Sequence, residues 1–126
     1  MKTFALGLLL LTAPALAFAH GTPPAATHGG QVQEDSADHW IELVIKGGQV
    51  IVYVSDENNK PIAASQLGGK VTLLVGGKTQ TVELKPAEGN SLTGSFAPAA
   101  TGKATAVLSL TVGGKPAQAR FASINQ

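Results

Sequence analysis

Residues 40–55 read WIELVIKGGQVIVYVS. Every second residue is apolar from residue 41 to residue 45 and again from residue 50 to residue 54. This alternation, with many β-branched residues, is typical of strands that bury one face. Gly47-Gly48 lies between the two halves, and glycine readily adopts the positive φ angles of a tight hairpin turn. We therefore expect residues 40–55 to form a β-hairpin.

The same pattern continues along the chain. Gly-Gly pairs at 76–77 and 113–114 each separate two alternating apolar runs, and no window of a dozen residues shows the helical spacing of 3.6. Residues 61–67, PIAASQL, predict either one helical turn or a short edge strand. The expected strands cover residues 41–45, 50–54, 71–75, 79–84, 92–96, 107–112 and 117–121.

Seven short strands joined by hairpins predict an all-β fold, a small antiparallel β-sandwich. An up-and-down barrel is the alternative arrangement. The chain has no cysteine, so burial and hydrogen bonding must stabilise the domain without disulfides. The apolar residues expected to build the core are Ile41, Leu43, Val52, Val54, Leu73, Leu84, Leu92, Phe96, Leu108, Leu110 and Phe121.

The first 19 residues, MKTFALGLLLLTAPALAFA, have the three parts of a secretory signal peptide. Lys2 supplies the positive charge, residues 4–12 form the apolar segment, and Ala17-Phe18-Ala19 is a small-x-small cleavage site. The apolar segment is shorter than the roughly 20 residues that span a bilayer. We expect residues 1–19 to be a cleaved signal peptide, the protein to be periplasmic, and no membrane span to be left after cleavage.

The segment that follows, residues 20–38, reads HGTPPAATHGGQVQEDSAD and is polar and rich in proline, glycine and small residues. Such composition is typical of a segment without a fixed structure. We expect residues 20–38 to be a flexible N-terminal arm, with 31–38 as a short entry into the fold, and residues 39–126 to be the β-sandwich domain.

Composition and motifs exclude several functions. The 9 basic and 8 acidic residues do not give the basic face that a nucleic-acid binder needs. The chain has no G-x-S-x-G, H-E-x-x-H or P-loop motif. The carboxylates Asp56, Glu57, Glu83 and Glu88 fall in or beside predicted turns or on a solvent face. We therefore predict no catalytic residues and no enzymatic activity.

The three histidines, His20, His28 and His39, fall within 20 residues and have acidic residues among them. A mobile arm brings such donors together at a modest cost in loop entropy. Cleavage after Ala19 would give His20 a free amine beside its imidazole, and Cu(II) favours such nitrogen and oxygen ligands in tetragonal geometry. We predict that His20, His28 and His39 are metal ligands.

The sulfur content narrows the choice of metal. The chain has no cysteine, and its one methionine, Met1, lies in the expected signal peptide. Cu(I) and other soft ions prefer sulfur ligands, so a methionine-based cuprous site cannot form in the mature chain. We therefore expect Cu(II), with Zn(II), Ni(II) and Co(II) as further ions that suit the same donors.

Structural roles for the histidines are the alternative. His20 is then the first residue of a disordered tail, His28 with Gly29-Gly30 is a turn or a docking element for the first strand, and His39 is partly buried at a strand start. Trp40 is then a core or rim aromatic. On this interpretation the protein is a metal-free periplasmic interaction module that adds a partner's strand to an exposed sheet edge.

Several short motifs resemble a family of small secreted bacterial domains. These domains occur alone or as the N-terminal module of periplasmic adaptor subunits of heavy-metal efflux pumps. The resemblance covers about residues 27–122 and rests on His28-Gly29-Gly30, Glu42-Leu43, Tyr53, Asp56, Lys60-Pro61 and the segment from Leu84 to Leu92.

This resemblance implies an immunoglobulin-like sandwich, an association with copper or heavy-metal handling, a component of a heavy-metal efflux system as partner, and no catalytic residues. Among the three histidines, His28 alone corresponds to a histidine of the family. The chain lacks the hairpin and membrane-fusion parts of an adaptor subunit, so we do not expect it to bridge a pump by itself.

Overall fold

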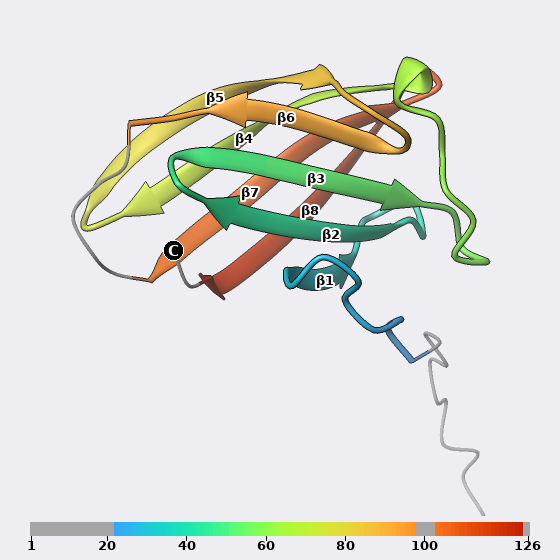
Figure 1. The fold of residues 1–126 in the computed structure, drawn as a ribbon, viewed down its shortest axis with the longest axis horizontal. Helices are drawn as coiled ribbons and strands as arrows, with labels where there is room; N and C mark the ends of the chain where they lie inside the picture. Colours follow the sequence, from blue (N-terminus) through green and yellow to red (C-terminus); the bar gives the residue numbers. More distant parts are fainter. Residues whose placement is uncertain (1–21, 98–102, 125–126) are drawn as a thin grey trace, which may run out of the picture.

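The computed structural model describes residues 22–97 and 103–124, so the expected signal peptide and His20 lie outside the described residues. The described residues contain no helix with the length and apolar character that a membrane span requires. They form strands and one short 3-10 helix, η1 (Figure 1). The elements are β1 (Gln31–Glu34), β2 (Trp40–Lys46), β3 (Gln49–Ser55), η1 (Ala64–Gln66), β4 (Leu67–Val75), β5 (Lys78–Pro86), β6 (Ser91–Ser95), β7 (Ala104–Val112) and β8 (Lys115–Ile124).

The eight strands form one antiparallel sheet in the order β1-β2-β3-β6-β5-β4-β7-β8. Strands β4, β5 and β6 make a meander, and β3 lies beside β6 while β7 lies beside β4, which gives two overlapping Greek keys. The sheet folds over on itself, so that β2 and β3 lie across β7 and β8 (Figure 1). The prediction of an all-β, sandwich-like fold is confirmed, with eight described strands where about seven were expected.

The two outer strands, β1 and β8, approach each other, so the curled sheet is nearly closed. The Ser36 amide donates to the carbonyl of Gln118 (2.9 Å), and the Gln118 amide donates to the Ser36 hydroxyl (3.0 Å). The Gln31 side-chain amide donates to the carbonyl of Ala122 (3.0 Å). Next to Ala122, Ser123 has a φ of 56°, and the pairing of β7 with β8 is irregular at this end. The two sheet edges are therefore bonded to each other through single side chains and one loop.

The eighth strand, β1, lies in the segment that was expected to be a short entry into the fold at the end of the N-terminal arm. Residues 31–34 pair with β2 from Gln31 opposite Leu43 to Glu34 opposite Trp40. The sequence QVQE has a single apolar residue and no alternating run, so pattern alone does not predict a strand there. The folded part of the chain therefore begins well before residue 39, because β2 supplies the hydrogen-bonding partners.

The segment 61–67 contains a helical turn, one of its two expected structures, next to a single β-bridge. Pro61 forms an isolated bridge with Ser55, and residues 64–66 form the 3-10 turn η1 before β4 begins at Leu67. The bridge places the turn after β3 beside the end of that strand.

The buried core contains nearly all the residues that the alternating pattern predicted for it. Ten of the eleven predicted core residues are buried, and the exception, Phe96, is partly buried against the core. Phe96 directly follows the last residue of β6, at the end of the strand, and its exposure is intermediate. The largest side chains with less than 2% exposure are Phe121, Ile41, Leu43, Leu73, Leu92, Leu108 and Leu110.

A core substitution tests this packing. Leu108 has 0% exposure, so Leu108→Ala should lower the free energy of unfolding by about 2–5 kcal/mol, through lost burial and the cavity left behind. Leu74, which is 46% exposed, provides the matched control, and Leu74→Ala should change stability by no more than about 0.5 kcal/mol. Urea denaturation measures both, and equal effects would contradict the packing described.

Candidate functional site

Glu42 is one of three buried polar residues in the described part of the chain. It lies in the middle of β2, opposite Tyr53 of β3, at a position whose strand neighbours Ile41 and Leu43 point into the core. An outward position on a two-layer fold is normally open to solvent, but the Glu42 side chain is only 8% exposed. Burying a carboxylate is costly unless hydrogen-bond donors replace its water.

The segment before β1 supplies those donors. Glu42 Oε2 accepts hydrogen bonds from the backbone amides of His28 and Gly30, both at 2.9 Å. Oε1 accepts from His28 Nδ1 (2.9 Å), the Thr27 amide (3.2 Å) and the Thr27 hydroxyl (3.3 Å). A Cβ atom at Gly30 would collide with the carbonyl oxygen of Leu43, so the backbone can approach β2 this closely because residue 30 is glycine.

The His28 ring also stacks on Tyr53. The two ring centroids are 3.6 Å apart and the ring planes differ by 3°. The His28 side chain is still 43% exposed, so part of it meets solvent. We call Thr27, His28, Gly30, Glu42 and Tyr53 the Glu42 cluster.

The ionised carboxylate of Glu42 determines which ring nitrogen of His28 carries the proton. Burial alone would raise the pKa of Glu42, but the hydrogen bonds from His28, Gly30 and Thr27 outweigh it and lower this pKa below its ordinary value of 4.5. Glu42 is therefore ionised at neutral pH and can only accept hydrogen bonds. His28 Nδ1 must then carry the proton, which leaves Nε2 with the free lone pair in the neutral ring.

His39 has the same arrangement with a different carboxylate. Asp35 lies in the turn between β1 and β2, and its side chain has 0% exposure. Its Oδ1 accepts from the amides of Ala37 (2.8 Å) and His39 (2.9 Å), and its Oδ2 accepts from His39 Nδ1 at 2.7 Å. The His39 side chain is 18% exposed, so its Nε2 is the ring nitrogen left without a carboxylate partner.

The two described histidines line different hollows on the surface. His28 lies beside a small hollow that Trp40, Tyr53 and Asn90 also line, whereas His39 lies in one with Asp56 and Glu57. No group of three or more histidine, cysteine or acidic side chains able to hold a metal ion occurs among the described residues. The described structure therefore places two of the predicted ligands, His28 and His39, in separate settings, and the third, His20, lies outside it.

Sequence reasoning did not identify the carboxylates that hold these rings. Glu42 appeared only within the family resemblance, and Asp35 only as one of several acids among the histidines. The signal available for Glu42 was a charged residue inside a strongly apolar strand. The expected docking role of His28 and the partial burial of His39 at a strand start both agree with the observed contacts.

Replacing Glu42 with glutamine tests the cluster. Glu42→Gln should lower the free energy of unfolding at pH 7 by about 2–3 kcal/mol, because it removes the charged acceptor of several hydrogen bonds. Since the pKa of Glu42 is lowered in the folded state, its contribution is complete above the ordinary value of 4.5 and is lost as the pH falls through the lower folded value. The difference between the two proteins should therefore shrink with acidification.

Urea denaturation at a series of pH values between 7 and 3, with a chelator present, makes this measurement. Glu83→Gln, at an exposed position of β5, serves as the control and should leave stability nearly unchanged. A destabilisation by Glu42→Gln that is constant with pH, or that Glu83→Gln reproduces, would contradict the assigned ionisation.

No family model, curated protein or solved structure matches this chain. The fold does, however, bring together several residues that carry the sequence resemblance. His28, Gly30, Glu42 and Tyr53 meet in one cluster. Asp56 accepts hydrogen bonds from the amides of Asn58 and Lys60 (both 2.9 Å) and so forms the turn after β3. The short motifs therefore have definite structural roles in this chain.

Proposed function

We propose that this protein is a periplasmic accessory protein that binds or handles a heavy-metal ion, with Cu(II) as the first candidate. The observation that carries the proposal is the pairing of His28 Nδ1 and His39 Nδ1 with buried carboxylates. Metal-binding histidines almost always donate their second ring N–H to a carboxylate, a carbonyl or a water, which sets the tautomer and orients the ring. Both rings are thereby prepared to offer Nε2 to a metal.

The donor set suits a borderline metal. His28 would provide an imidazole nitrogen, and His20 would add an imidazole and, after cleavage at Ala19, an amine. His39 lines a separate hollow, so it would share the same ion only if the two hollows come together on binding. The chain has no cysteine and its one methionine is Met1, so thiolate and thioether ligands play no part in the proposed site. Cu(II) prefers this nitrogen and oxygen chemistry, and Zn(II), Ni(II) and Co(II) accept it as well.

Two further points support this function over a metal-free interaction module. The resemblance to domains of heavy-metal efflux adaptors includes His28 itself, which suggests a component of such a system as partner. Strand addition needs an open sheet edge, but the outer strands β1 and β8 are bonded to each other through Ser36 and Gln31.

Copper titration tests the proposal. Isothermal titration of the purified protein with Cu(II) should give about one ion per chain, and electron paramagnetic resonance should show nitrogen ligands. Alanine substitution of His20 or His28 should weaken binding, and His39→Ala tests whether the His39 ring joins the same ion. Glu42→Gln, which leaves all three histidines in place, should weaken it by about 10–100-fold because the His28 ring loses its orienting partner.

The control is again Glu83→Gln, which should bind Cu(II) like the unchanged protein. Adding one residue before His20 in the mature protein should weaken binding if the terminal amine is a ligand. An affinity no greater than that of free histidine, or an affinity that the three histidine substitutions leave unchanged, would refute the function.

A further inference from the structure

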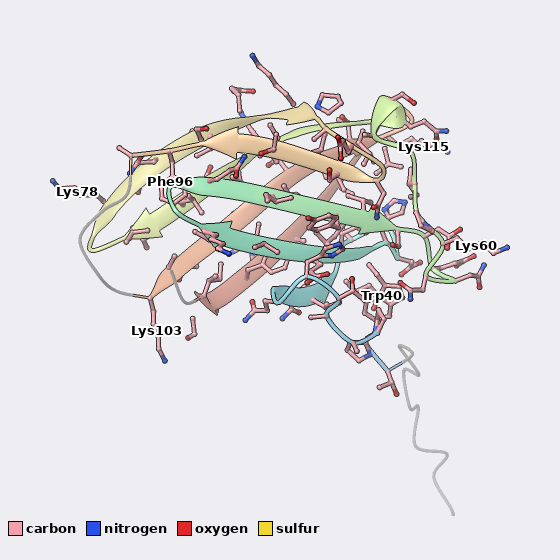
Figure 2. All side chains as sticks on the ribbon, viewed as in Figure 1. Trp40, Lys60, Lys78, Phe96, Lys103 and Lys115 are labelled. Atoms are coloured by element: carbon pink, nitrogen blue, oxygen red, sulfur yellow. The ribbon has the colours of Figure 1, made fainter. Side chains whose placement is uncertain are left out.

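Charge is unevenly distributed between the two ends of the sheet. Lys46 lies at the β2–β3 turn, Lys78 at the β4–β5 turn and Lys103 just before β7, and all three are exposed. Figure 2 shows Lys78 and Lys103 at the left end of the molecule, with Lys60 and Lys115 at the right. The strand pairing places the eight acidic residues, at positions 34, 35, 38, 42, 56, 57, 83 and 88, in the middle of the sheet or toward the right end.

The left end also carries an exposed leucine. Leu74, at 46% exposure, is the one exposed large hydrophobic side chain in the described part of the chain. Its partners in the sheet are Thr79, next to Lys78, and Thr105, two residues after Lys103. The leucine therefore lies in the sheet within one or two residues of Lys78 and Lys103 along the neighbouring strands. We call Lys46, Leu74, Lys78 and Lys103 the basic end.

We propose that the basic end docks onto an anionic lipid surface. Each lysine held near an anionic bilayer gains electrostatic attraction, and an exposed leucine adds apolar area that the bilayer interface can bury. The acidic residues do not cancel this attraction. Those at the right end are roughly 25 Å away, the length of a strand of seven to nine residues, and even Glu42, four residues from Lys46 in β2, is roughly 13 Å away. Both distances exceed the screening length of about 8 Å at physiological salt.

A protein partner fits the basic end less well. The cores of protein interfaces are enriched in aromatic side chains and depleted in lysine, and a stable interface buries about 800 Å² on each partner. Phe96, which Figure 2 shows at this end, is partly buried against the core and packs with the domain itself. What the basic end offers is one leucine among lysines, a composition suited to a charged lipid surface.

Vesicle co-sedimentation tests the docking. The protein expressed from the full chain should bind vesicles that contain phosphatidylglycerol more tightly than vesicles of phosphatidylcholine alone, and high salt should abolish the difference. The triple variant Lys46→Gln, Lys78→Gln, Lys103→Gln should lose about fivefold in partitioning for each lysine. Leu74→Thr should weaken binding and leave its salt dependence in place.

The matched control is Lys60→Gln, Lys85→Gln, Lys115→Gln, which removes the same charge from the opposite end and should bind nearly as the unchanged protein does. All variants share the same N-terminal segment, so any lipid affinity of that segment cancels in the comparison. Equal binding to neutral and anionic vesicles, or equal losses in the two triple variants, would overturn the proposal. Because neither triple variant removes a histidine, the outcome is independent of metal binding.

Discussion

The buried carboxylate of Glu42 is the constraint on which the N-terminal part of this structure depends. A charge on β2 with 8% exposure has to find donors, and the segment at residues 27–30 supplies five hydrogen bonds to it. Satisfying that carboxylate holds the chain across the outside of β2 and β3 just before β1 begins. Gly30 bonds to Glu42 directly before β1 begins, so this contact adds to the pairing with β2 that holds β1 in place.

The sequence pattern predicted the parts of the fold that depend on local burial, and it did not predict the parts that depend on contacts with distant residues. Alternating apolar residues predicted the seven longer strands because burial of one face is a local property of each strand. It did not predict β1, since the strand state of QVQE arises from pairing with β2. Glu42 lies between two core residues, Ile41 and Leu43, and therefore faces away from the core. What covers this face is a segment twelve to fifteen residues away, whose position no local pattern encodes.

The candidate site was also predicted only in part. Sequence reasoning singled out the histidines because few residue types bind borderline metals, but it did not pair them with their carboxylates. The contacts of His28 and His39 are structural, and the same contacts leave Nε2 of each ring as the nitrogen that a metal could bind. A structural role and a ligand role therefore use opposite nitrogens of the same ring and do not compete.

Metal binding and the N-terminal segment are coupled if His28 is a ligand. The ring is held by Glu42 and Tyr53, so a metal on Nε2 would favour the conformation in which residues 27–30 lie against β2. Any ligand that binds this conformation and not the open one stabilises it by mass action. The basic end lies at the ends of the strands, whereas the Glu42 cluster lies over the middle of β2 and β3. A lipid surface at the basic end would therefore leave the His28 ring open to solvent. Metal capture and surface docking would then take place on the same chain without obstructing each other.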